Sequence, residues 1–264
     1  MLGFRRRRRL RIKAQPFPPA WLAIVNKYVP YVQCLSESDK SELYGHIKVF
    51  IAEKSFEGCG GLVMTDEIRV TIAAQACVLL LHRDSGYYPD LRTILVYPSS
   101  YVAPVKRPLG GNGAIIETAE LRAGESWHRG SLVLSWRDVQ AGSAQPCDGR
   151  NVVFHEFAHQ LDSESGAVEG APALEGRSAY AAWATVLGRE FQSLMQDLRT
   201  NRPTLMGGYA AKNPAEFFAV VTEVFFERPQ ELKGRHPELY EQFRQFYKQD
   251  PATWMGTCER AAAG

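Results

Sequence analysis

A short motif of two histidines and a glutamate within an apolar segment most strongly constrains how this 264-residue chain can fold. The motif has the pattern H-E-x-x-H and reads His155-Glu156-Phe157-Ala158-His159. Residues four apart share one face of a helix, so the two imidazoles can reach the same ion. Glu156 is rotated by about 100° around the helix axis, which suits a general base acting on water at that ion.

The residues around the motif predict that its helix, expected over 151–162, is buried. They are mostly apolar: Val152, Val153, Phe154, Phe157, Ala158 and Leu161. Two histidines and a glutamate are costly in such surroundings unless they are paired or bind a metal. The sequence therefore predicts a metal site, in preference to a chance match on a charged surface helix.

A third ligand does not follow the motif in the way it does in metzincins, which place a glycine and then a histidine there. This chain has Asp162 and Ser165 at those positions. Asp162 lies seven residues after His155, a rise of about 10.5 Å along a helix, which is too long for one ion. We expect Asp162 to act as a hydrogen-bond acceptor or a cap.

Two carboxylates on a later helix, expected over 214–227, are the candidates for the third ligand. Pro214 suits the first helical position, Glu216 falls in the first turn, and Glu223 lies two turns later on the same face. Glu216 could instead form a capping box with Asn213, and Glu223 could accept a hydrogen bond from a ligand histidine. Spacing alone leaves these alternatives open.

The remaining pattern predicts an α+β fold, mainly helical with a small mixed sheet, in a single domain over 1–264. Apolar residues make up 45% and charged residues 23%, which excludes disordered, collagenous and coiled-coil proteins. Further helices are expected around 21–29 and 43–50, over 65–81 and 178–199, and after residue 237. Strands are expected over 93–97, 114–121 and 130–136, without regular alternation with helices.

Charge is distributed unevenly along the chain. Residues 1–13 carry seven basic side chains and no acidic one, whereas residues 14–264 carry 24 basic and 29 acidic side chains. We expect a flexible leader over about 1–15; the alternative is a contact with nucleic acid, anionic lipid or an acidic partner. The acidic remainder argues against nucleic acid as the main ligand.

The longest apolar stretch, 72–81, is too short to span a bilayer, so no membrane partner is expected.

The five cysteines predict reduced thiols. They are far apart and form no C-x-x-C pair: Cys34, Cys59, Cys77, Cys147 and Cys258. An odd number without such spacing argues against a disulfide framework or a cysteine zinc site. We therefore expect a cytoplasmic protein.

Several segments together resemble the Mlc titration factor A family of bacterial zinc metallopeptidases. The resemblance covers nearly the whole chain and is carried by residues 155–162, Tyr209, residues 213–219, and an opening with Phe4, the arginine run, residues 16–18 and Trp21. It implies a gluzincin-like core related to the catalytic domain of anthrax lethal factor. It also implies His155, His159 and Glu216 as ligands of one Zn2+ ion, Glu156 as the base and Tyr209 as a catalytic tyrosine.

The same resemblance implies a cytosolic aminopeptidase that binds the glucose repressor Mlc and so affects the glucose phosphotransferase system. Its substrates would be peptides, whose extended backbone could pair with the strand expected over 130–136; the alternative for that strand is an ordinary place in the sheet. One competing function is a repressor-sequestering protein with a structural zinc site and no catalysis. Another is a metal hydrolase that cleaves a different bond.

Overall fold

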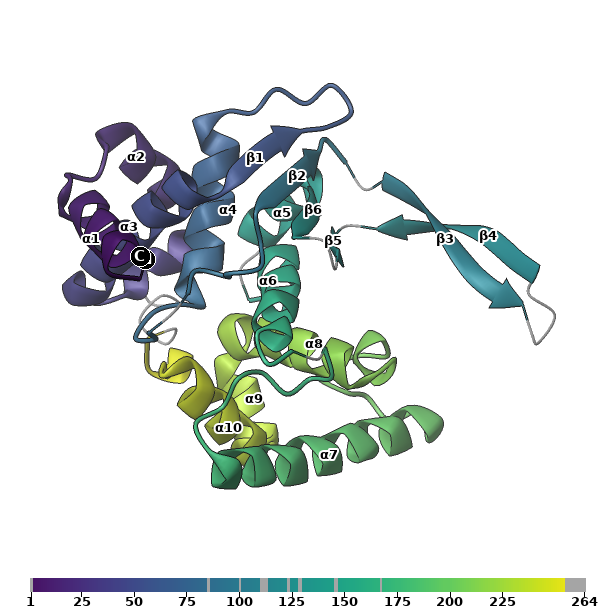
Figure 1. Cartoon of the computed structure of the whole chain (residues 1–264). Coiled ribbons are helices and arrows are strands. Elements are labelled where there is room, and N and C mark those ends of the chain that lie inside the picture. The colour runs from purple at the N-terminus through teal and green to yellow at the C-terminus, as the bar shows by residue number, and fades with distance from the viewer. Residues whose placement is uncertain are drawn as a thin grey trace.

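The computed structural model describes residues 2–84, 86–99, 101–109, 114–122, 124–127, 130–144, 147–166 and 168–254. The first elements are α1 (Leu2–Ala14), α2 (Pro19–Tyr28), η1 (Pro30–Cys34), α3 (Glu37–Glu53), β1 (Ser55–Gly58), α4 (Asp66–Val78), β2 (Thr93–Tyr97), β3 (Tyr101–Leu109), β4 (Ala114–Arg122), β5 (Gly124–Trp127) and β6 (Ser131–Ser135). The later ones are α5 (Trp136–Ala144), α6 (Val152–Ser163), α7 (Arg177–Arg199), η3 (Tyr209–Ala211), α8 (Pro214–Glu227), α9 (Pro229–Arg235) and α10 (Pro237–Tyr247). Figure 1 shows α6 and α8 in the middle, with α1–α4 and the sheet on one side and α7, α9 and α10 on the other.

The main sheet is small and mixed, which confirms the predicted α+β class. Its strand order is β1-β2-β6-β5. Strands β1, β2 and β6 are parallel, whereas β5 runs antiparallel to β6. Because β6 lies between two strands, it cannot also pair with a substrate backbone, so that interpretation of residues 130–136 is wrong. The outer strand beside β6 is β5, which also contacts α6.

Most of the predicted helices are confirmed, and the structure adds short elements. The helices expected over 151–162, 178–199 and 214–227 are α6, α7 and α8. The strand predicted over 114–121 is β4, but it does not join the main sheet. It pairs with β3 in an antiparallel hairpin that extends away from the rest of the molecule in Figure 1.

The basic N-terminal segment differs from the flexible leader that we expected, because residues 2–14 form helix α1, which packs on α3. Arg9 donates two hydrogen bonds to Glu53 at 2.9 and 2.8 Å, and Arg5 donates a third at 2.9 Å. At the other end of α1, the Lys48 ammonium donates to the carbonyl groups of Lys13, at 2.7 Å, and Gln15. These contacts fix both ends of the helix to α3.

The cysteines only partly follow the expectation of reduced thiols. Cys59, Cys77 and Cys147 are not in disulfide bonds, whereas Cys34 is disulfide-bonded, so the prediction is wrong for Cys34. Burial raises the pKa of the Cys77 thiol, which keeps it protonated. No helix in the described part of the chain is long and apolar enough to cross a membrane.

Aromatic packing holds α6 and α8 in place. On the α6 side, the Phe157 ring lies 5.7 Å from Phe50 and 4.8 Å from Tyr88. On the α8 side, the Phe218 ring lies 5.8 Å from Trp183 and 5.6 Å from Phe243. Ring pairs at these separations add to the free energy gained from burial. The two central helices therefore rest on opposite parts of one continuous core.

We predict that Glu53→Gln lowers the free energy of unfolding by about 1–2 kcal/mol at neutral pH, because the neutral amide replaces charge-assisted hydrogen bonds. Burial raises the Glu53 pKa, but hydrogen bonds from Arg9 and Arg5 outweigh it and lower the pKa from 4.5 to about 2. The stabilisation is therefore present above pH 4.5 and is lost as the pH falls towards 2. Denaturant unfolding of both proteins across this range measures the difference.

A matched control is Glu37→Gln, because the Glu37 side chain is 90% exposed and pairs with Lys40 on the same helix. This change should alter the free energy of unfolding by less than about 0.5 kcal/mol. Equal stability of Glu53→Gln and the wild type at neutral pH would contradict the role assigned to the α1–α3 contact.

Candidate metal centre

Helix α6 carries both histidines of the motif, and its first turn explains their placement. The Asn151 side chain caps the helix and accepts hydrogen bonds from the backbone N–H groups of Val153 and Phe154, both at 3.1 Å. The apolar residues of α6 face the core, which leaves His155 and His159 together on the remaining face. Their ring centroids are 4.9 Å apart.

Helix α8 brings the candidate third ligand to the same place. Pro214 begins the helix, and the Asn213 side chain accepts a hydrogen bond from the Glu216 N–H at 2.9 Å. The cap therefore involves the backbone of Glu216 and leaves its carboxylate available. Gly170 makes the close approach to α8 possible: it has φ of +75°, and a Cβ there would lie 2.4 Å from the Pro214 carbonyl oxygen.

The side chains of His155, His159 and Glu216 converge, with ligand atoms that all lie within 4.8 Å of one another. The Glu216 Oε2 atom lies 3.0 Å from His155 Nε2 and 3.4 Å from His159 Nε2. Two imidazole nitrogens and one carboxylate form a donor set that suits zinc and leaves a fourth position for water. The residues present thus fit a zinc ion.

The electrostatics of the cluster favour a cation. Burial lowers the pKa of His155, but hydrogen bonds with Glu216 and Glu223 outweigh this and raise it to about 10. Burial raises the Glu216 pKa, but the contacts with His155 and His159 bring it well below its usual range. Positive charge between these side chains is therefore stabilised.

Glu223 meets the other side of the His155 ring. Its Oε1 atom lies 2.7 Å from His155 Nδ1, and its Oε2 atom accepts a hydrogen bond from the Asn151 N–H at 2.6 Å. A ring that donates from Nδ1 presents Nε2 to a metal. The geometry therefore distinguishes the two carboxylates that spacing left equivalent: Glu216 faces both histidines, and Glu223 orients one of them.

Glu156 is nearly enclosed, with only 6% of the residue exposed. Its Oε2 atom and the His159 Nδ1 atom are buried without a hydrogen-bond partner among the described residues. Burial raises the pKa of the Glu156 carboxyl, which makes its anion a stronger base than an exposed carboxylate. An unpaired carboxylate beside a cation site has the chemistry of a proton acceptor.

Asp162 lies outside the converging group and acts as a hydrogen-bond acceptor. Its Oδ2 atom accepts from the Gly170 N–H at 2.8 Å, and the Gly170 carbonyl in turn accepts from the Trp183 indole at 2.8 Å. This chain of bonds attaches the segment between α6 and α7 to both helices. It agrees with the role expected for Asp162 from its distance along the helix.

Tyr209 and Lys212 lie at the open side of the site. The Tyr209 residue is 56% exposed and donates a hydrogen bond from its hydroxyl to Glu216 Oε1 at 3.2 Å. Its ring centroid lies 5.8 Å from that of His155. The Lys212 ammonium lies 3.6 Å from Glu216 Oε1 and 5.3 Å from the centre of the Tyr209 ring. Sequence reasoning missed Lys212, although its position four residues before Glu216 could have identified it.

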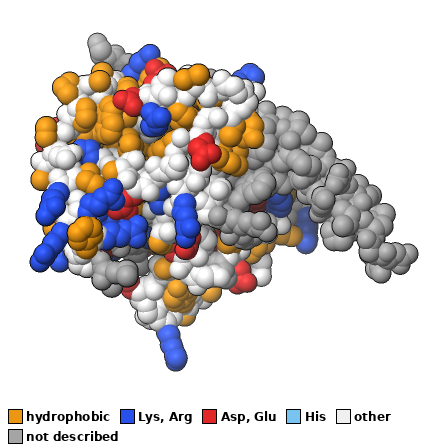
Figure 2. Space-filling model, turned by 45° about the horizontal axis from the view of Figure 1, so that its top comes forward, with side chains coloured by type: hydrophobic (Ala, Val, Ile, Leu, Met, Phe, Trp, Pro, Cys, Tyr) orange, Lys and Arg blue, Asp and Glu red, His pale blue; other side chains and the backbone are white. Residues whose placement is uncertain are grey.

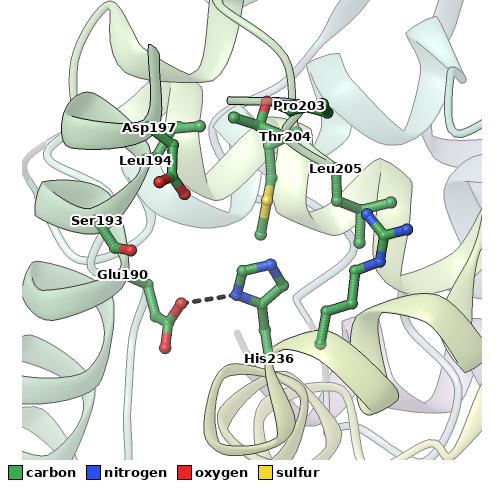
Figure 3. Close-up of a pocket in the computed structure, with 10 residues that line it drawn as sticks. Glu190, Ser193, Leu194, Asp197, Pro203, Thr204, Leu205 and His236 are labelled. Atoms are coloured by element: carbon green, nitrogen blue, oxygen red, sulfur yellow. Dashed lines mark hydrogen bonds and ion pairs between the residues drawn. The ribbon is translucent and has the colours of Figure 1, made fainter. Parts of the chain in front are cut away.

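The loop that leads to Tyr209 borders a separate cavity of about 80 Å³. Figure 3 shows its lining, in which His236 at the start of α10 bonds to Glu190 of α7 through Nδ1 and Oε2 at 2.8 Å. Leu205 of the loop also lines the cavity and is itself buried. The loop is thus held by α7 on one side, while its end presents Tyr209 to the metal centre.

Comparisons with known proteins identify the family of this chain. Residues 3–248 match the model of the family described as glucose-regulated metallo-peptidase M90. An uncharacterized protein from Synechocystis sp. is 44% identical over 239 residues, which are 90% of this chain and 86% of the relative. Mlc titration factor A from Yersinia pestis and from Yersinia pseudotuberculosis is 29% identical over 238 residues, 89% of this chain and 87% of each relative. The chain therefore belongs to the glucose-regulated metallopeptidase family M90.

Proposed function

We propose that this chain is a zinc-dependent peptidase of the aminopeptidase type. The observation that carries the proposal is the convergence of His155, His159 and Glu216 next to Glu156, a buried carboxylate whose Oε2 atom has no hydrogen-bond partner among the described residues. A purely structural zinc site has no use for such a base. The family membership supports peptide-bond cleavage as the reaction.

In this mechanism His155, His159 and Glu216 hold the ion, and Glu223 fixes the orientation of His155. Bound zinc would supply Lewis-acid chemistry that polarises a peptide carbonyl and acidifies water. Glu156 accepts the proton of the attacking water and later passes it to the leaving amine. The Tyr209 hydroxyl donates a hydrogen bond to the oxyanion that develops on the carbonyl.

Three finer parts of the proposal rest on the resemblance and the relatives. We propose that the chain binds a repressor of the Mlc type, because relatives that match along most of its length are named Mlc titration factor A. We also propose that it works in the cytoplasm, and that its single domain has a gluzincin-like core. The competing function, repressor sequestration without catalysis, predicts that loss of Glu156 leaves every activity unchanged.

We predict that Glu216→Ala lowers zinc affinity far more than Glu223→Ala does. The first change removes a ligand, whereas the second removes only the orienting partner of His155 and should cost about 10–100-fold. Competition with a zinc chelator measures both affinities. Glu175→Ala is the control, because the Glu175 side chain is 90% exposed and pairs with Lys248. The reverse ranking would make Glu223 the ligand.

We predict that Glu156→Gln keeps the fold and bound zinc but lowers kcat by about 10²–10⁴, because an amide cannot accept the proton. Elemental analysis, circular dichroism and hydrolysis of amino-acid anilides test the three parts of this statement. Turnover at the wild-type rate would remove Glu156 from the mechanism. A repressor of the Mlc type that still binds the inactive variant would show that recognition does not depend on catalysis.

We predict that Tyr209→Phe lowers kcat by about 10²–10³ with little change in KM, because the hydrogen bond is made chiefly in the transition state. The side chain is largely exposed, so its hydroxyl is not needed for folding. Zinc affinity is measured in parallel, because the hydroxyl also contacts Glu216. A kcat within about twofold of wild type in the zinc-loaded variant would leave Tyr209 without a catalytic role.

A further inference from the structure

Helix α1 uses one of its faces to attach to the rest of the molecule. Arg5 and Arg9 bind Glu53, and the Arg8 guanidinium donates to the Ala52 carbonyl at 3.3 Å. Arg9 also donates to the Gly86 carbonyl at 2.9 Å and lies 4.5 Å above the centre of the Tyr87 ring. These contacts account for how a basic helix docks on α3, and they involve only the arginines on the inner face.

The opposite face of α1 combines free positive charge with exposed apolar side chains. The guanidinium groups of Arg6, Arg7 and Arg11 are exposed and make no hydrogen bond or ion pair within the described part of the chain. Phe4 is 80% exposed and Leu10 is 57% exposed. Residues 4, 7 and 11, and likewise 6 and 10, are three or four apart, so the five side chains share the outer half of the helix. On this side of the molecule, Figure 2 shows Lys and Arg side chains next to hydrophobic ones.

The outer arginines cost stability in the isolated chain. Arg6 and Arg7 lie near the positive end of the helix dipole, and α1 has no acidic residue in its first turn. Like charges three or four residues apart on a helix repel one another, as Arg7 and Arg11 do here. Glu53 forms ion pairs with Arg5 and Arg9 of the inner face, and no acidic side chain in the described part of the chain pairs with Arg6, Arg7 or Arg11. An anionic surface against the outer face would relieve both costs.

We propose that the outer face of α1, formed by Phe4, Arg6, Arg7, Leu10 and Arg11, binds anionic lipid at a membrane surface. Guanidinium groups form bidentate hydrogen bonds with lipid phosphates. Phe4 and Leu10 would enter the boundary between headgroups and acyl chains, as apolar residues of interfacial helices do. The phosphates of a nucleic acid could also bind the arginines, but a nucleic acid offers no apolar region in which Phe4 and Leu10 could be buried.

This surface contact needs no membrane-spanning helix, and it departs from our expectation of no membrane partner. That expectation considered only whether a segment could cross a bilayer. In Figure 1, α1 lies at the outer edge of the N-terminal helices, whereas α6 and α8, which carry the candidate metal site, lie in the middle of the molecule. A chain bound through α1 can therefore keep its metal centre open to water.

The test measures binding of the full-length protein to vesicles of phosphatidylglycerol mixed with phosphatidylcholine, and to phosphatidylcholine alone, by co-sedimentation. The wild type should bind the anionic vesicles and dissociate from them at high salt, and it should not bind the neutral vesicles. Each basic residue close to an anionic surface contributes about fivefold to binding. The triple variant R6Q/R7Q/R11Q should therefore bind on the order of a hundredfold more weakly.

Two further variants make the test specific. F4S/L10S keeps every charge and should lower vesicle binding by about tenfold or more, because it removes the buried apolar area. R177Q/R199Q/R202Q removes the same charge from exposed positions on and after α7 and should bind nearly as well as the wild type. Thermal unfolding checks that each variant retains α1, whose inner contacts are left intact.

Three outcomes would overturn the proposal. The first is equal loss of vesicle binding in the α1 and α7 triple variants, which would reduce the effect to net charge. The second is wild-type binding by F4S/L10S together with loss in R6Q/R7Q/R11Q, which would leave a charge contact without insertion. The third is salt-sensitive binding of a DNA or RNA duplex in place of the vesicles, which would assign the face to nucleic acid.

Discussion

The imidazole of His155 lies between two carboxylates of α8, Glu216 and Glu223. The relative placement of α6 and α8 depends on these contacts. Glu223 holds Nδ1 at 2.7 Å, and Glu216 approaches Nε2 at 3.0 Å. The same Glu223 carboxylate accepts the N–H of Asn151, the residue that caps α6. The start of α6 and the ligand-bearing face of α8 are therefore fixed by the same few bonds. Either helix placed differently would separate the side chains of the candidate metal site.

Charge explains why this centre suits a divalent ion. Glu156, Glu216 and Glu223 surround the histidines, and a fourth carboxylate, Glu227, lies one turn beyond Glu223. Burial raises the Glu227 pKa to about 7, although hydrogen bonds from the Cys147 N–H and the Asn151 amide oppose the shift. Four carboxylates thus lie around the two histidines, and the two positive charges of a divalent ion would offset part of their negative charge.

The parts of the site that the sequence predicts well are those specified by neighbouring residues. Asn213 and Pro214 are local helix signals, so the start of α8 could be placed, and the spacing of His155 and His159 follows from helix geometry. The choice between Glu216 and Glu223 required tertiary structure, because it depends on which nitrogen of His155 each carboxylate meets. Lys212 was missed because a lysine four residues before a glutamate is usually an ordinary surface pair.

The fold was harder to predict where stabilisation comes from distant residues. Helix α1 lacks an apolar face of its own and depends on Glu53, whose partner Arg5 is 48 residues away in sequence. The short strands β1 and β5 contain four residues each, too few to show a periodic pattern. Strand β3 contains Pro104 and Pro108, which argue against a strand in the main sheet, and it pairs only with β4.

Gly170 connects three helices, because its backbone contacts each of them. Its N–H binds Asp162 at the end of α6, its carbonyl binds Trp183 of α7, and its Cα faces the Pro214 carbonyl at the start of α8. Gly170 thus contacts α6, α7 and α8 and helps to set the distances between them. These contacts link the spacing between the histidines of α6 and the carboxylate of α8 to the position of α7. A displacement of α7 would therefore alter the distance between the two histidines of α6 and the Glu216 carboxylate of α8.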